Sequence, residues 1–233
     1  MIDARQRLIV ALDYSSAEEA KNLVRQLDGM VSFFKVGLEL YTATGPAFVR
    51  ELIADGKQVF LDAKFLDIEE TVRRSVQVAA GLGVSFLTVH EAGKTVSAAV
   101  RGVQGTEAKI LAVTVLTSMS DADIREVGFQ CSVEELVLHR AKKAIAAGCH
   151  GIVASGQEAN QIRGLSNNVI IVTPGIRPAG AERHEQQRSV TPQLAIQAGA
   201  DYLVVGRPIR DARDPREAAQ RIIDEIEASV TNG

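Results

Sequence analysis

The sequence contains only two cysteines, Cys131 and Cys149, which are too few for a disulfide framework and show no metal-ligand spacing. No apolar run approaches the roughly 20 residues of a membrane-spanning helix, and the run at residues 8–12 is shorter than that of a secretory signal. Positive charge is not in excess either, since 26 Lys and Arg against 29 Asp and Glu give a net charge of −3. This balance excludes a nucleic-acid binder held by bulk charge. We therefore expect a cytoplasmic protein with no membrane or nucleic-acid partner.

The composition is that of a globular protein, with 46% hydrophobic and 24% charged residues in a chain of 233. Such a chain can bury a sizeable core. An α/β barrel commonly occupies about 250 residues as one unit, and neither a Pro-, Gly- or Ser-rich linker nor a shift in composition divides this sequence. We expect a single domain over residues 1–233.

Eight short runs rich in β-branched residues recur along the chain, each bounded by turn residues. Most are apolar almost throughout, which is typical of parallel strands that are covered on both faces. They lie at residues 8–12, 33–36, 58–63, 86–90, 109–116, 151–154, 169–172 and 202–205.

The segments between these runs carry signals for the start of a helix, either a capping box or a capping residue followed by proline. These signals are Ser15 with Glu18, Ser132 with Glu135, Thr191-Pro192 and Asp214-Pro215. Eight alternating strands and helices predict the α/β class and a single closed (β/α)8 TIM barrel. An open sheet of six or seven strands is the alternative.

Charged residues occur where several of the predicted strands end, namely Asp13, Lys35, Asp62 and Lys64. Burying these charges separately is costly, so we expect them to form one network at the carboxyl end of the barrel, where barrel enzymes place their active sites. Asp67 follows just beyond the third strand. A lysine between carboxylates stays protonated and can donate a proton. A purely structural ion-pair network at the barrel rim is the other interpretation.

A second signal follows the seventh and eighth strands, where barrels often bind phosphate. Gly175 and Arg177 follow the seventh strand, and Gly206-Arg207 follows the eighth. Glycine lets the backbone approach an anion, and arginine supplies forked donors. Residues 176–190 show no clear period and are predicted to be a loop that closes over the phosphate, with a solvated excursion as the alternative.

The motifs as a set resemble those of the orotidine 5′-phosphate decarboxylase family of the bacterial type. They are DAKFLDI at 62–68, KVG at 35–37, TPGIR at 173–177, Asp13 and Gly206-Arg207. The resemblance implies a homodimeric (β/α)8 barrel that removes CO2 from orotidine 5′-monophosphate to give UMP, the last step of de novo pyrimidine synthesis. It also implies that no metal and no organic cofactor takes part.

The resemblance also assigns roles to individual residues. Lys64 would protonate C6 of the pyrimidine, in a charged row with Lys35, Asp62 and Asp67 of the neighbouring subunit, so the active sites would be shared across the dimer. The implied substrate-binding residues are Asp13 and Lys35 for the ribose, Ile68 and Thr71 beside Asp67, Thr117 for the base, Gln186 between base and phosphate, and Arg177, Gly206 and Arg207 for the phosphate.

Two stretches depart from the family pattern. Glu69-Glu70-Thr71 stands where Pro-Asn-Thr is common, and residues 91–94 (EAGK) replace a small, glycine-rich turn. One rival interpretation is a metal-dependent relative, a 3-hexulose-6-phosphate synthase or keto-gulonate-phosphate decarboxylase, although those enzymes typically carry an acidic residue at the position of Lys35. The other rival is a non-catalytic barrel that binds a phosphorylated ligand.

Overall fold

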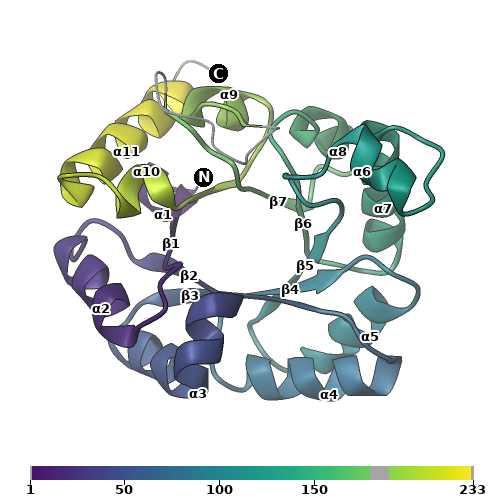
Figure 1. Ribbon diagram of the computed structural model, residues 1–233, viewed down its shortest axis with the longest axis horizontal. Coiled ribbons are helices and arrows are strands. Elements are labelled where there is room, and N and C mark those ends of the chain that lie inside the picture. The colour runs from purple at the N-terminus through teal and green to yellow at the C-terminus, as the bar shows by residue number, and fades with distance from the viewer. Residues whose placement is uncertain (1, 179–188, 232–233) are drawn as a thin grey trace.

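A computed structural model describes residues 2–178 and 189–231, and its eight strands form a closed parallel barrel in sequential order, with β1 paired to β8 (Figure 1). The predicted TIM barrel is therefore confirmed, and the open sheet is excluded. The strands are β1 (Leu8–Ala11), β2 (Phe33–Gly37), β3 (Gln58–Phe65), β4 (Phe86–His90), β5 (Lys109–Val113), β6 (Gly151–Val153), β7 (Ile170–Thr173) and β8 (Tyr202–Val205).

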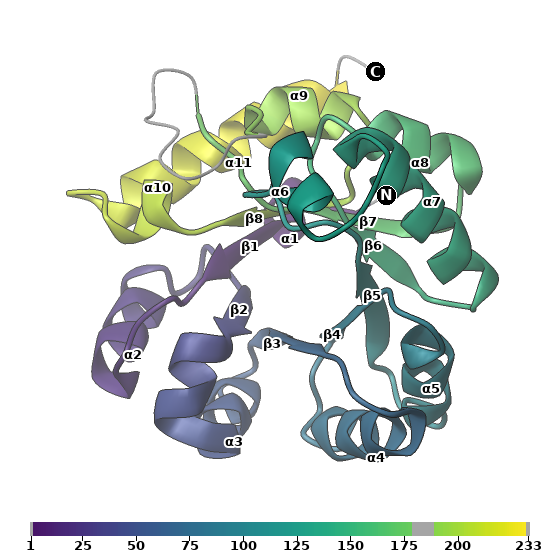
Figure 2. The same cartoon turned by 45° about the vertical axis from the view of Figure 1, so that its right-hand side comes forward.

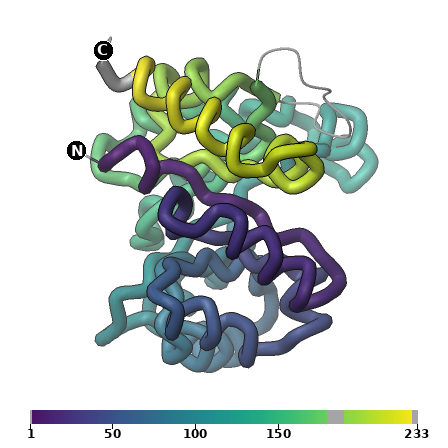
Figure 3. Tube along the Cα trace, turned by 90° about the vertical axis from the view of Figure 1, so that its left-hand side faces the viewer, coloured from purple at the N-terminus to yellow at the C-terminus, as the bar shows by residue number. Residues whose placement is uncertain are grey.

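Helices surround the barrel on its outer side (Figures 1 and 2). They are α1 (Ala4–Arg7), α2 (Ala17–Gln26), α3 (Leu38–Ala54), α4 (Glu69–Ala80), α5 (Thr95–Gly102), α6 (Asp121–Glu126), α7 (Val133–Ala146), α8 (Ala159–Leu165), α9 (Pro192–Gln197), α10 (Arg207–Arg210) and α11 (Pro215–Thr231). Helix α11 lies beside α1, so the two ends of the chain meet on one side of the barrel (Figure 3). None of the helices within the described residues is long and apolar enough to cross a membrane.

The strands are apolar almost throughout because each has helices on one face and the barrel interior on the other. Inward side chains such as Phe33, Phe60 and Phe86 pack with Leu111 in an interior cluster, and the rings of Phe33 and Phe86 lie 5.1 Å apart. Alternate residues of the same strands point outward into the larger core beneath the helices. The interior layer of rings closes the barrel below the charged residues.

Three of the predicted helix starts are confirmed, and one is wrong by a residue. Ser132 and Glu135 form a capping box before α7, and Thr191 and Asp214 cap α9 and α11. The predicted cap at Ser15 with Glu18 is replaced by Ser16 with Glu19, since the Ser16 hydroxyl accepts the Glu19 N–H.

Two strands differ in length from their prediction. Strand β5 ends at Val113 instead of residue 116, because the neighbouring β6 has three residues and pairs with residues 111–113 alone. Strand β3 instead runs two residues further, to Phe65. That extension brings Lys64 into the strand and carries it to the mouth of the barrel.

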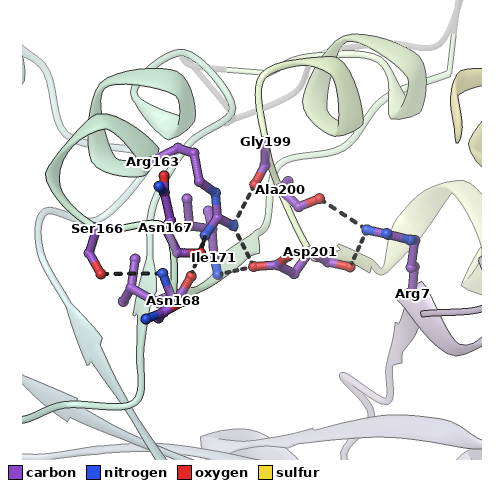
Figure 4. A network of polar contacts seen from close by, with 10 residues as sticks. Arg7, Arg163, Ser166, Asn167, Asn168, Ile171, Gly199, Ala200 and Asp201 are labelled. Carbon is purple, nitrogen blue, oxygen red and sulfur yellow. Dashed lines mark hydrogen bonds and ion pairs between the residues drawn. The ribbon is translucent and has the colours of Figure 1, made fainter. Parts of the chain in front are cut away.

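A polar network ties β7 to β8 at the amino-terminal end of the barrel (Figure 4). Arg163 of α8 donates to the Asp201 carboxylate at 2.7 Å, and that carboxylate also accepts the Ile171 N–H at 2.8 Å. Arg7 donates to the carbonyl of Asp201 at 3.2 Å, which links α1 to the same loop. These contacts lie at the opposite end of the strands from the cavity described next.

Candidate active site

A cavity of about 460 Å³ opens at the carboxyl ends of the strands. Its lining combines apolar, acidic and cationic residues. The apolar residues are Ala11, Phe60, Val113, Val115, Leu116, Val153, Pro174 and Val204. The polar and charged residues are Asp13, Lys35, Asp62, Lys64, Thr117, Ser118, Gly175, Arg177, Gly206, Arg207 and Arg210.

Four charged side chains form one continuous row along this cavity. Lys35 Nζ lies 2.8 Å from Asp13 Oδ1 and 3.8 Å from Asp62 Oδ2, and Lys64 Nζ lies 2.9 Å from the same Asp62 oxygen. Negative and positive groups alternate along the row, so each charge is next to an opposite one. The network expected at the strand ends is therefore present, from β1 through β3.

Asp62 is the centre of the row, and its side chain is 14% exposed. Burial alone would raise the pKa of the Asp62 carboxyl, but the ammonium groups of Lys35 and Lys64 outweigh it and hold that pKa below its ordinary value. Hydrogen bonds from Lys64 and Thr88 act in the same direction. Asp62 is thus a carboxylate at neutral pH, although most of its side chain is removed from solvent.

Gly37 makes room for the first pair of the row. A Cβ on Gly37 would lie 2.9 Å from Lys35 Nζ and 3.1 Å from Asp13 Oδ1, which is too close for both atoms to keep their places. The lack of space for a Cβ therefore explains why glycine occupies the last position of the KVG motif.

Lys64 occupies a bulge in β3. Opposite β4, the pairing advances from Leu61 with Leu87 to Phe65 with Val89, so β3 uses four residues where β4 uses two. Lys64 has φ of 50°, a left-handed conformation that is uncommon for a residue with a side chain. This conformation lets Lys64 line the cavity while its side chain remains 28% exposed.

The segments that follow β7 and β8 bring guanidinium groups and glycine backbone to the cavity, and a Cβ on Gly206 would lie 3.6 Å from Asp13 Oδ2. Gly206 ends the connection from β8, and Arg207 begins α10. Arg177 is buried, and its backbone N–H donates to the Val190 carbonyl at 2.9 Å, which joins the two flanks of the segment between β7 and α9. A short helix after β8 is the usual setting for phosphate in barrels of this kind.

The structure brings most of the predicted site residues together, but not all of them. Asp67, Ile68 and Thr71 lie outside the cavity lining and are exposed, with Ile68 at 74%. The Asp67 carboxylate accepts the Ile68 N–H at 2.6 Å. Gln186 lies outside the described residues, as does most of the predicted loop at 176–190.

Two residues of the site were not identified from the sequence. Arg210 lines the cavity, and Thr88 contacts Asp62 from β4. Thr88 is the one hydroxyl in the otherwise apolar run 86–89, two residues after the inward Phe86, so alternation could have placed it inside the barrel. Arg210 lies one helical turn after Arg207, which is a weaker signal.

Comparison with known proteins gives the same assignment along nearly the whole chain. The sequence profile of the orotidine 5′-phosphate decarboxylase / HUMPS family matches residues 6–222. The chain belongs to this family. A family member from Nitrobacter winogradskyi, named orotidine 5′-phosphate decarboxylase, is 56% identical over 224 residues, which cover 96% of this chain and 93% of that protein. The relationship expected from the motifs is confirmed.

Solved structures of the family have the same fold. The orotidine 5′-phosphate decarboxylase from Lactobacillus acidophilus superposes with a TM-score of 0.84 at 35% identity, covering 94% of this chain and 98% of that one. The enzyme of the same name from Pyrococcus horikoshii gives 0.75 at 27% identity, with 94% and 99% coverage.

Proposed function

We propose that this chain decarboxylates orotidine 5′-monophosphate to UMP, with Lys64 as the proton donor. The observation that carries the proposal is the arrangement of the cavity: Lys64 Nζ lies 2.9 Å from the Asp62 carboxylate, and Arg177 and Arg207 line the same space. Family membership supports the same reaction, because close relatives bear the name of this enzyme.

The proposed chemistry needs one cation at the carbon that loses CO2. As the bond from C6 to the carboxylate breaks, its electron pair remains on C6, and the Lys64 ammonium stabilises the negative charge that develops there. The ammonium then gives its proton to C6, and the neutral amine regains a proton from solvent. Asp62 keeps Lys64 beside the reacting carbon through their ion pair.

The cationic residues of the cavity fit the phosphate of the nucleotide. Arg207 and the Gly206 backbone would hold it, together with Arg177, while Asp13 and Lys35 would bind the ribose hydroxyls and Thr117 the base. Contacts with a phosphate far from C6 can stabilise the transition state through positioning, so a substrate without phosphate should react poorly. We assign Gln186 to the link between base and phosphate on the strength of the family resemblance.

We further propose that two copies of this domain, each spanning residues 1–233, share their active sites. Asp67, Ile68 and Thr71 are exposed and lie outside the lining of their own cavity, and Leu66 is exposed beside them, so this segment is available to a second copy. Asp67 would then extend the charged row of the partner. The two free cysteine thiols fit the reducing cytoplasm, where we place the enzyme.

The metal-dependent rival is disfavoured by the charge of the row. Two ammonium groups, on Lys35 and Lys64, lie beside the Asp62 carboxylate and would repel a divalent cation there. Turnover of orotidine 5′-monophosphate should therefore survive EDTA. Loss of activity on chelation that is restored by Mg²⁺ would instead favour the synthase relatives.

The proton-donor role is tested by Lys64→Ala, assayed by the fall in absorbance of orotidine 5′-monophosphate. We expect kcat to fall by about 10²- to 10⁴-fold or more, while UMP still binds. Lys57→Ala is the matched control, because Lys57 immediately precedes the same strand at its other end and pairs with Asp28. An unchanged rate in Lys64→Ala would reject the proton-donor role of Lys64. Absence of turnover by the wild-type protein would instead favour the non-catalytic barrel.

Site sharing is tested by mixing two inactive variants, Asp67→Ala and Lys64→Ala. In an equal mixture with free exchange, half of the dimers are mixed and each has one intact site, so activity should recover to about a quarter of the wild-type value. No recovery after subunit exchange has been verified would show that Asp67 acts within its own chain.

A further inference from the structure

Thr88 is a fully buried hydroxyl at the centre of β4, between the apolar neighbours Leu87 and Val89. It lies opposite the β3 bulge, in the interval where β4 advances two residues and β3 advances four. The side chain points into the barrel, as Phe86 does two residues earlier. A hydroxyl in this place has to be satisfied by neighbouring groups, because water does not reach it.

The Thr88 hydroxyl forms hydrogen bonds with two members of the charged row. It donates to Asp62 Oδ1 at 2.8 Å, and it accepts the backbone N–H of Lys64 at 3.0 Å. The other oxygen of the same carboxylate, Oδ2, pairs with Lys64 Nζ at 2.9 Å. Asp62 is thus held from both sides, and the backbone of Lys64 is fixed at the residue with the left-handed φ of 50°.

We infer that Thr88 is a positioning residue for decarboxylation, which fixes the Asp62 carboxylate and the Lys64 backbone in the geometry that aims the Lys64 ammonium. This inference rests on the proposed function. Thr88 does not line the cavity and need not touch the substrate. It acts by holding a strained segment whose displacement by about 1 Å would move the proton donor away from the reacting carbon.

Valine tests this role, because Thr88→Val keeps the size and branching of the side chain and removes the hydroxyl. Both the Lys64 N–H and Asp62 Oδ1 then lose a buried partner. We expect kcat to fall by about 10- to 100-fold, as is typical when a group that orients an active-site residue is lost. KM should change by less than about threefold, because the phosphate and ribose contacts remain.

Two further variants separate positioning from packing. Thr88→Ser keeps the hydroxyl and should restore kcat to within about threefold of the wild type. Thr114→Val removes another fully buried hydroxyl, just beyond β5, which donates to the Val153 carbonyl; within the described part of the chain it makes no hydrogen bond to the charged row. Thr114→Val should leave kcat unchanged even if it lowers the Tm as much as Thr88→Val does.

The dependence of kcat on pH distinguishes positioning from packing, because a residue that only packs in the core would not shift it. The hydrogen bond from Thr88 helps to lower the pKa of Asp62, so its loss should raise that pKa. The acid limb of kcat for Thr88→Val should therefore lie at higher pH than that of the wild type or of Thr88→Ser. If the valine variant does not fold, Thr88→Ala takes its place in the same comparisons.

The inference is overturned if folded Thr88→Val keeps the wild-type kcat, if the serine variant is as slow as the valine variant, or if Thr114→Val loses as much. These outcomes leave the proposed function intact, because wild-type turnover is measured alongside. Absence of turnover by the wild-type protein would defeat the proposed function and the inference together.

Discussion

Replacing Arg163 by methionine should destabilise the protein without lowering its activity. Arg163 belongs to the network at the amino-terminal end of the barrel (Figure 4), whereas the charged row of the cavity lies at the carboxyl end of the strands. Methionine keeps the unbranched aliphatic stem and removes the guanidinium. The two ends of a barrel are expected to separate in this way, with stability at one end and chemistry at the other.

The size of the effect follows from four hydrogen bonds. Arg163 Nη1 donates to the carbonyls of Asn167 and Val169 at 3.0 and 2.7 Å, and Nη2 donates to the Gly199 carbonyl and the Asp201 carboxylate at 2.9 and 2.7 Å. A hydrogen bond to a charged group contributes about 1.5–3 kcal/mol. Because Arg163 and Asp201 are 25% and 27% exposed, water can replace part of each contact. We therefore expect a total loss of about 2–3 kcal/mol.

This loss corresponds to a fall in Tm of about 5–10 °C for a protein of this size. Urea unfolding of Arg163→Met, Asp201→Asn and the double variant measures the coupling of the pair, which should be about 1 kcal/mol. Arg221→Met is the matched control, since Arg221 pairs with Glu217 on the exposed face of α11 and should contribute less than about 0.5 kcal/mol.

Two results would refute this reasoning. One is a free energy of unfolding for Arg163→Met that matches that of Arg221→Met, which would mean that solvent fully replaces the network. The other is a fall in kcat, measured well below the Tm, that is comparable to the effect of changing Lys64. In that case the amino-terminal end of the barrel would control the geometry of the cavity.

Three smaller predictions concern single groups. Burial alone would raise the pKa of Asp62, but Lys35 and Lys64 hold it below the ordinary value of 3.8. The charged carboxylate therefore stabilises the protein above about pH 4, and this contribution is lost as the pH falls through the lowered pKa. In urea titrations below about pH 4, Asp62→Asn should lose less stability than the wild type. Burial raises the pKa of the Cys149 thiol to about 12, so iodoacetamide at pH 8 should label it slowly until the protein unfolds. Ser132→Ala should cost about 1 kcal/mol in urea unfolding by removing the α7 cap.

The strand order and the gathering of charges could be predicted from the sequence because both depend on local pattern. Strands covered on both faces are apolar throughout, so a charged residue at the end of such a run marks the barrel mouth. Asp13, Lys35 and Asp62 were found in this way, and the structure joins them in one row. Local pattern was also sufficient for the α7 cap, where a single Ser and Glu pair fits.

The local sequence pattern did not predict features for which two assignments have the same spacing, or which depend on how neighbouring strands pair. Ser15 with Glu18 and Ser16 with Glu19 have the same spacing, and the choice between them depends on which face of α2 is buried, a property of the packed barrel. The bulge at Lys64 arises from the register of β3 against β4, which separate stretches of sequence determine together. The end of β5 likewise depends on the length of β6.

The network around Arg163 and the charged row of the cavity differ in how many of their hydrogen-bond donors have partners. We relate the first network to stability and the second to activity. Arg163 directs its terminal nitrogens to carbonyls and one carboxylate that the backbone holds in place. Among the residues that the structure describes, the Lys64 ammonium pairs with Asp62, which leaves donor capacity directed toward the cavity. Such a cation keeps its position only if neighbouring groups hold it. Asp62 does so, and Thr88 holds both Asp62 and the Lys64 backbone through hydrogen bonds. A substitution of Asp62 or Thr88 should therefore lower kcat with little change in Tm, whereas a substitution of Arg163 should lower the Tm with little change in kcat.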